Sequence, residues 1–166
     1  MRILVAEDDP FFRELLQKLL SAEYEVSIAE HGIQAWEMIQ QSPRPLLVIL
    51  DWVMPGLAGP QVCRKVRTHA EAAGNYLILL TARNSAADIV AGMRAGADDY
   101  MTKPFEPEEL RVRVRVGQRI IHLQQELAAV HTELDRAALR EQALKGQLAA
   151  VLANNETQSL IKGASA

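Results

Sequence analysis

The sequence predicts an α/β fold: a doubly wound, five-stranded parallel sheet followed by a long C-terminal helix. Two observations predict it. Short apolar runs alternate five times with longer segments whose apolar residues recur at helical spacing. The runs are also apolar almost without interruption, which is typical of strands buried on both faces by helices. We therefore expect right-handed crossover connections and a helical layer on each side of the sheet.

Each expected strand is a short apolar run that ends at a polar or turn-forming residue. The third run, Leu46 to Leu50, is the most hydrophobic and is closed by Asp51. The fourth run ends at Thr81, and the fifth is the shortest. Strands are expected at residues 2–6, 24–29, 46–50, 76–80 and 99–102.

The expected helices are amphipathic segments between these runs. The first carries Leu15, Leu16 and Leu19 at helical spacing. Pro60 suits the first turn of the third helix, because a proline there loses no helical hydrogen bond. Helices are expected at residues 10–21, 32–41, 60–68 and 85–95, with a longer one beginning at residue 107.

Composition narrows the class of protein. The 166 residues suit one domain and an extension, and 49% hydrophobic residues allow a core. A net charge of −3 disfavours bulk binding to nucleic acid or anionic membrane. The single cysteine, Cys63, lies in an apolar-periodic stretch and is expected to be a buried structural thiol. No signal-peptide pattern or membrane-length apolar run is present, so we expect a cytoplasmic protein without membrane insertion.

Acidic, hydroxyl and lysine side chains that could form one site follow the first, third, fourth and fifth expected strands. In open parallel α/β sheets the binding site lies beyond the carboxyl ends of the strands. These residues should therefore converge on one edge of the sheet, although they are distant in the sequence. They are Glu7, Asp8 and Asp9 after the first strand, Asp51 after the third, Thr81 after the fourth and Lys103 after the fifth.

Such a set of side chains suits phosphoryl transfer. Clustered carboxylates repel one another unless a cation joins them, and Mg²⁺ is the best fit because it accepts carboxylates together with water and phosphate oxygens. The carboxylate of Asp51 can attack phosphorus to give an aspartyl phosphate. The metal and Lys103 would offset the charge on the phosphoryl oxygens, and Thr81 can donate a hydrogen bond to one of them.

Four segments resemble the signature blocks of response-regulator receivers of two-component signalling. The resemblance covers about residues 1–117, and four blocks in this order and spacing are specific. It implies the flavodoxin-like strand order 2-1-3-4-5. The segments are residues 3–9 (ILVAEDD), 51–56 (DWVMPG), 79–82 (LLTA) and 96–105 (GADDYMTKPF).

By this resemblance Glu7 and Asp8 form the acidic pocket, with Asp8 as the direct metal ligand and Asp51 as the phosphorylated residue. The main-chain carbonyl of Val53 is implied as a further metal ligand. The family often has Asp where Glu7 stands, so this longer side chain would reach the ion through water. Trp52 is expected to be partly exposed beside the metal.

The resemblance also implies how the signal would be relayed. Thr81 and Lys103 would bind the phosphoryl group, and Lys103-Pro104 is expected to be a cis peptide. Thr81 would move toward the phosphoryl group and Tyr100 would follow it inward, which makes a two-state switch. In similar domains the positions of Val53 and Arg83 govern attack by water, so an apolar Val53 predicts slow self-dephosphorylation.

A heptad pattern follows the predicted domain. Four heptads of this quality favour a coiled coil, and a helix over residues 107–152 would be roughly 70 Å long. We expect a parallel homodimer through residues 118–152 and a frayed tail at 153–166. Antiparallel pairing, folding back, or a solvated helix lacking its partner domain are alternatives. One series is Ile120, Leu127, Leu134, Glu141 and Leu148, and the other is Leu123, Val130, Ala137, Leu144 and Val151.

The resemblance implies a signalling module that takes its phosphoryl group from a histidine kinase or phosphotransfer protein, without direct nucleic-acid binding. A receiver followed by such a helix is similar to the front end of diguanylate cyclases or regulator-type phosphatases. The chain is either a stand-alone regulator or a part of something longer. A phosphohydrolase of the haloacid-dehalogenase type is disfavoured, because Val53 stands where its second Asp would lie. A degenerate, purely dimerising receiver is disfavoured by the intact Asp51 and Lys103.

Overall fold

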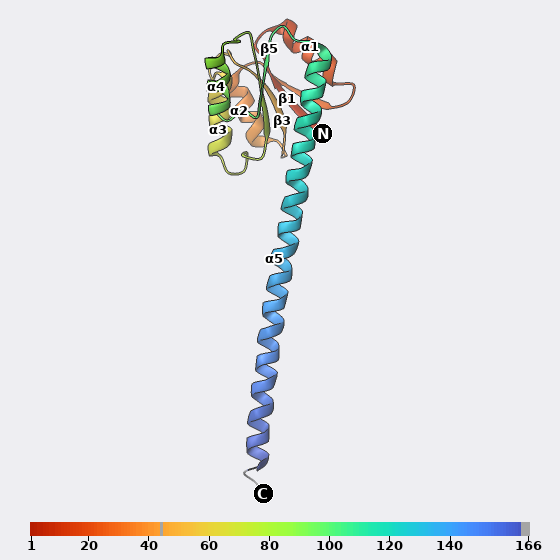
Figure 1. The fold of residues 1–166 in the computed structure, drawn as a ribbon, viewed down its shortest axis with the longest axis vertical. Coiled ribbons are helices and arrows are strands. Elements are labelled where there is room, and N and C mark those ends of the chain that lie inside the picture. Colours follow the sequence, from red (N-terminus) through yellow and green to blue (C-terminus); the bar gives the residue numbers. More distant parts are fainter. Residues whose placement is uncertain (44, 164–166) are drawn as a thin grey trace. The chain divides into compact units, whose positions relative to one another are not determined.

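The computed structural model describes residues 1–43 and 45–163, with side chains described as far as residue 150. Strands and helices alternate along the chain, and each expected boundary within residues 1–107 lies within one residue of the observed one. In order, the elements are β1 (Arg2–Ala6), α1 (Pro10–Leu20), β2 (Glu25–Ala29), α2 (Gly32–Gln41), β3 (Leu47–Asp51), α3 (Gly59–Thr68), β4 (Tyr76–Thr81), α4 (Ala86–Arg94), β5 (Asp99–Thr102) and α5 (Pro107–Gly163), as Figure 1 shows.

The strands form one five-stranded parallel sheet in the order β2-β1-β3-β4-β5, which confirms the predicted fold. β2 pairs with one edge of β1, and β3 pairs with the other edge. The connections that follow β1 and β3 therefore run in opposite directions, and the crevice between them is where doubly wound sheets bind ligands. Ala6 pairs with Leu50, and Thr81 pairs with Thr102, so the strand ends are level with one another.

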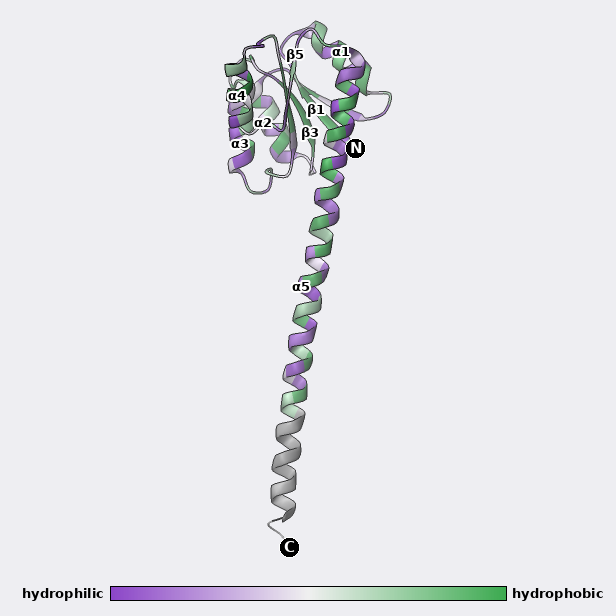
Figure 2. Ribbon diagram, viewed as in Figure 1, coloured by the Kyte–Doolittle hydropathy of each residue, from purple (hydrophilic) through white to green (hydrophobic). Residues whose placement is uncertain are grey.

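Alternating side chains of the strands feed two apolar clusters, one on each face of the sheet. Leu4 and Val48 point into the cluster that is covered by α2 and α3. Ile3 and Ile49 point into the cluster that is covered by α1 and the beginning of α5. Figure 1 shows these two helical layers, and Figure 2 shows the hydrophobic strands between them. Burial of both faces is the reason that the strands read as continuous apolar runs.

Cys63 lies on α3 and is completely buried in the first of these clusters. Burial, the largest influence, raises the pKa of its thiol to about 12. A thiol that stays protonated at neutral pH is a poor nucleophile. The prediction of a structural thiol is confirmed.

α5 begins as a packed helix and continues as an exposed one. Leu110, Val114 and Ile121 are buried against the sheet. Ile121 still packs against the sheet, the first compact unit ends at Gln124, and a second unit begins at residue 125. The helix is assigned as far as Gly163, whereas residues 164–166 of the expected frayed tail lie outside the described residues.

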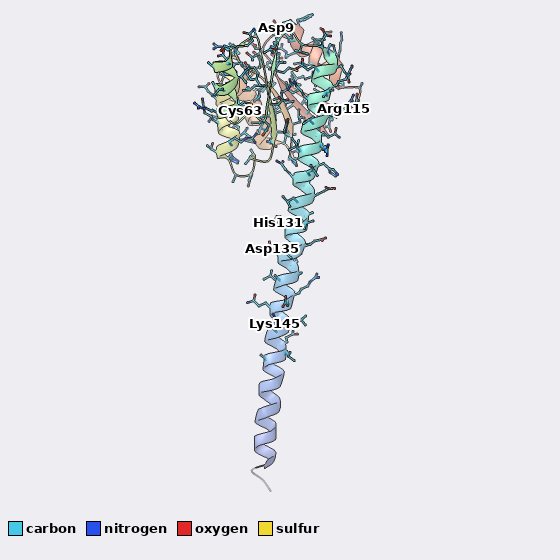
Figure 3. All side chains as sticks on the ribbon, in the orientation of Figure 1. Asp9, Cys63, Arg115, His131, Asp135 and Lys145 are labelled. Atoms are coloured by element: carbon cyan, nitrogen blue, oxygen red, sulfur yellow. The ribbon has the colours of Figure 1, made fainter. Side chains whose placement is uncertain are left out.

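In the second unit, every described side chain, as far as residue 150, is exposed. Figure 3 shows these side chains projecting from the helix. Among the described helices, none combines the length and the hydropathy that crossing a membrane requires. Exposed leucines and valines recur along this unit: Leu127, Val130, Leu134, Leu139, Leu144 and Leu148.

Candidate phosphoacceptor site

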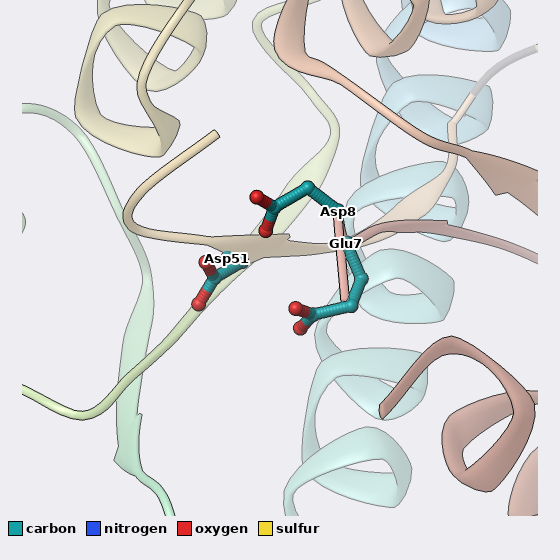
Figure 4. A group of neighbouring side chains, drawn as sticks. All are labelled: Glu7, Asp8 and Asp51. Carbon is teal, nitrogen blue, oxygen red and sulfur yellow. The ribbon is translucent and has the colours of Figure 1, made fainter. Parts of the chain in front are cut away.

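Three carboxylates gather where β1 and β3 end. Glu7, Asp8 and Asp51 each offer one oxygen, and these atoms lie within 4.8 Å of one another (Figure 4). Glu7 and Asp51 are nearly inaccessible, with 1% and 8% of their surface exposed, whereas Asp8 is exposed. The pairing of β1 with β3 brings the three together, as predicted, although more than forty residues separate Asp51 from Glu7 and Asp8 in the chain.

The loop that carries the first two carboxylates is fixed by the beginning of α1. Asp9 caps this helix, because its side chain accepts hydrogen bonds from two N–H groups in the first turn. Arg13 donates to the main-chain carbonyls of Glu7 and Asp8 over 3.0 and 2.8 Å. Asp9 is therefore committed to the helix, and the side chains of Glu7 and Asp8 are held beside β3.

Lys103 reaches the same cluster from the end of β5. Its Nζ donates to Glu7 Oε2 over 2.6 Å and to Asp51 Oδ1 over 3.0 Å. Its backbone N–H donates to the carbonyl of Thr81 over 2.7 Å, which anchors the lysine to the adjacent strand. The Lys103-Pro104 peptide is cis, as expected. Lysine, glutamate and aspartate thus meet from three different strands of the sheet.

The charges of this cluster are unbalanced. Burial, the largest influence, raises the pKa of both Glu7 and Asp51, while the hydrogen bond from Lys103 opposes the shift in each. The charge of Asp51 raises the pKa of Glu7 further. Three carboxylates and one ammonium leave an excess of negative charge that a divalent cation would neutralise. Because all the donor atoms are carboxylate oxygens, the cluster fits a hard ion such as Mg²⁺.

Asp51 and Thr81 present their polar atoms at neighbouring strand ends. Asp51 Oδ2 accepts a hydrogen bond from the N–H of Val53 over 3.2 Å. The buried Thr81 accepts a hydrogen bond at its Oγ1 from the N–H of Arg83 over 3.1 Å. The side chain of Val53 is exposed beside Asp51. The expected metal-binding role of the Val53 carbonyl stays a prediction.

Tyr100, the expected switch residue, is buried under the loop that follows β4. Its hydroxyl donates to the carbonyl of Arg83 over 2.5 Å, and its ring meets the edge of Trp52 at a centroid distance of 6.2 Å. The Arg83 guanidinium lies 5.7 Å from the centre of the Trp52 ring. Thr81 and Tyr100 therefore hold the same loop residue, one through its N–H and the other through its carbonyl.

Sequence reasoning missed two residues that organise the site. Arg13 was not singled out, although it donates to two main-chain carbonyls of the acidic loop, and Phe12, whose ring lies beside the Lys103 ammonium, was given no part in the site. The signal for both was their position in the first turn of the helix that follows the acidic run. Trp52 is partly exposed, as expected.

Comparisons with known proteins agree with this geometry. The family model described as "Response regulator receiver domain" matches residues 3–115. The chain therefore belongs to the response regulator receiver family, a family of signalling domains.

Among curated proteins, the chain is 45% identical over 130 residues to the response regulator MprA of Mycobacterium ulcerans, a match covering 78% of this chain and 55% of that protein. It is 41% identical over 119 residues to the DNA-binding response regulator MtrA of Mycolicibacterium smegmatis, covering 71% of this chain and 50% of that protein. The chain thus spans about half the length of these relatives.

Among solved structures, the receiver domain of a sensor histidine kinase from Pseudomonas aeruginosa is 30% identical, with a TM-score of 0.64. The match covers 73% of this chain and 97% of that one, and that domain holds a magnesium ion in its active-site cleft. The relatives give no support to the expected likeness to diguanylate-cyclase front ends, since the output named among them is DNA binding.

Proposed function

We propose that the chain is a phosphorylation-controlled signalling module in which Asp51 accepts a phosphoryl group from a histidine kinase or phosphotransfer protein. The observation that carries this proposal is the contact of one nearly buried lysine with Asp51 and Glu7 inside a group of three carboxylates. Mg²⁺ would be held by Glu7, Asp8, Asp51 and the Val53 carbonyl, and when bound it would neutralise charge on the phosphoryl oxygens.

The protein's own groups are placed for this transfer. An oxygen of Asp51 forms the new bond to phosphorus, and the bond from phosphorus to the donor breaks with its electron pair going to the donor. The ammonium of Lys103, 3.0 Å from Asp51 Oδ1, would then pair with a phosphoryl oxygen. Thr81 has a hydroxyl hydrogen available for another phosphoryl oxygen, because its Oγ1 serves only as an acceptor for Arg83.

The signal would be relayed through Arg83, the loop residue that both Thr81 and Tyr100 contact. If the Thr81 hydroxyl turns toward the phosphoryl group, its bond to the Arg83 N–H changes. The same residue's carbonyl is the partner of Tyr100, so the position of the Tyr100 ring is coupled to the state of Asp51. Thr81 and Tyr100 would therefore act as the switch, with the phosphoryl charge biasing two arrangements of the loop.

We further propose that the chain forms a homodimer through residues 118–152, most of which lie in the second unit. The apolar heptad residues of the second unit, as far as residue 150, are exposed in a single chain, and pairing would bury them. MtrA is a DNA-binding regulator, but its match to this chain covers half of its length. With a net charge of −3, the present residues are proposed to act without direct contact to nucleic acid.

Labelling with acetyl phosphate tests the function. We expect one phosphoryl group per chain by intact mass spectrometry, in Mg²⁺ but not in EDTA, and none in Asp51→Asn. Asp9→Asn is the matched control, because it removes a neighbouring charge while Asn still caps α1, and it should be labelled normally. Continuous turnover of donor would indicate a phosphohydrolase instead, and absence of labelling would indicate a degenerate receiver.

The exposed Val53 predicts a long-lived phosphoryl group, because its apolar side chain offers nothing to orient a water molecule beside Asp51. Val53→Asn should accelerate dephosphorylation by about tenfold, equivalent to about 1.4 kcal/mol in the barrier. The measurement is phosphate release after removal of donor. Val112→Asn, an exposed valine on α5, is the control, and equal decay rates in all three proteins would contradict the prediction.

A further inference from the structure

The ammonium of Lys103 has a third neighbour besides its two carboxylates. Its Nζ lies 4.3 Å from the centre of the Phe12 ring. The lysine side chain is 10% exposed, so little water competes for this position. An aromatic face carries partial negative charge, and a cation within about 6 Å of the ring centre is attracted to it. Glu7, Asp51 and the ring therefore all contact the same ammonium group.

The ring is itself held in place by packing. Phe12 belongs to the first turn of α1, directly behind the acidic loop. It packs against Phe105, at a centroid distance of 6.5 Å, and against the edge of Phe11 at 5.6 Å. Phe105 lies two residues after Lys103, so the same contact ties the loop of the lysine to α1.

We propose that Phe12 is a positioning residue, whose ring keeps the Lys103 ammonium at Asp51 ready for the incoming phosphoryl group. This proposal rests on the proposed function of Asp51. A neutral ring suits the task, since a further carboxylate would compete for the metal and for the ammonium. The contact to Glu7 is shorter than that to Asp51, 2.6 against 3.0 Å. Without the ring, we expect the ammonium to shift away from Asp51.

A double-mutant cycle separates positioning from simple packing. Phe12→Leu keeps an apolar side chain but removes the ring face, and it should slow phosphorylation by acetyl phosphate by about threefold to tenfold. Phe12→Trp should restore the rate. In a Lys103→Met background, Phe12→Leu should have no further effect, because the ring would act only through the ammonium. Phe11→Leu is the control and should leave the rate unchanged, because Phe11 is 71% exposed and leucine keeps an apolar neighbour beside the Phe12 ring.

Nuclear magnetic resonance gives a readout that does not require phosphorylation. The ring face should shift the ε protons of Lys103 upfield in the unmodified protein. The shift should disappear in Phe12→Leu and persist in Phe11→Leu. A normal Lys103 spectrum, an unchanged rate in Phe12→Leu, or an equal loss of rate in the Lys103→Met background would overturn the proposal. If Asp51 is not labelled but the shift is present, the proposed function fails while the ring contact stands.

Discussion

At the residue scale, the burial and the charge of Glu7 and Asp51 decide how much the site costs in stability when no metal is bound. Both carboxyls are nearly inaccessible, and one ammonium must serve both. An ionised carboxylate away from water is costly unless it is paired. The site is therefore an arrangement kept for function at some expense of stability, and cation binding should relieve that expense.

The raised pKa values of Glu7 and Asp51 predict a pH dependence of stability. The folded, metal-free protein binds protons that the unfolded chain, with ordinary values of 4.5 and 3.8, releases. The stability contributed by these groups is complete below those values and is lost as the pH rises through the folded pKa values. In EDTA, their contribution to the free energy of unfolding should fall as the pH rises from about 4 toward neutral.

Urea unfolding over this pH range, in EDTA and in Mg²⁺, measures the effect. Mg²⁺ at a hundredfold excess over its Kd should stabilise the protein by about 2.7 kcal/mol near neutral pH, because it favours the ionised carboxylates. Asp51→Asn should weaken both the decline in EDTA and the gain from Mg²⁺. Asp9→Asn should change neither, and an undiminished decline in Asp51→Asn would refute the assignment.

At the element scale, α5 has a different environment in each of its two parts. Its beginning packs on the sheet so closely that a Cβ at Gly117 would lie 2.5 Å from the Tyr76 ring and 2.8 Å from Leu47. Nothing lies within 4 Å of the equivalent position at Gly146. The two glycines of this helix therefore differ. Gly117 allows close approach to the sheet, whereas a side chain at position 146 would meet no neighbour.

This difference predicts opposite effects of the same substitution. Gly117→Ala should destabilise the first unit by about 1–3 kcal/mol, because the added methyl group overpacks the interface. Gly146→Ala should instead stabilise the helix by about 0.5–1 kcal/mol, since alanine has the higher helix propensity. Urea unfolding followed by tryptophan fluorescence measures the first, and far-UV circular dichroism during heating measures the second. Equal effects at both positions would show that the helix packs differently.

At the scale of the whole molecule, the exposed apolar side chains of the second unit form the proposed dimer seam. Leu134 lies in the predicted heptad series, and Leu139 lies outside it. The two leucines are equally accessible in a single chain, at 65% and 66%. Any difference in their effect on assembly must therefore come from contacts with a second molecule.

Aspartate substitutions at these positions test the homodimer. Leu134→Asp should raise the dissociation constant of the dimer by at least about tenfold, or about 1.4 kcal/mol, because it places a charge in the apolar seam. Leu139→Asp should leave assembly unchanged. Light scattering over a concentration series gives the mass of each protein. A monomeric unmodified chain, or equal weakening by both substitutions, would exclude the predicted seam.

Sequence by itself determined the strands, the helices and the residues that gather at the candidate site, because these follow from short-range patterns. Apolar runs mark the buried strands, and the polar residue that closes a run is forced to the carboxyl edge of a parallel sheet. The convergence of Glu7, Asp51 and Lys103 could thus be predicted without coordinates. Nearly all of the fold up to residue 107 was predictable on the same basis.

Only the tertiary structure decided which other side chains surround those charges. Two contacts depend on the angle at which α1 meets the sheet. They are the contact of the Phe12 ring with Lys103 and the hydrogen bonds from Arg13 to the main chain of the acidic loop. In the same way, α5 packs on the sheet as far as Ile121, and the close approach at Gly117 is part of this contact. Such contacts depend on side-chain volumes from several elements together, and a periodic pattern within one segment carries no information about them.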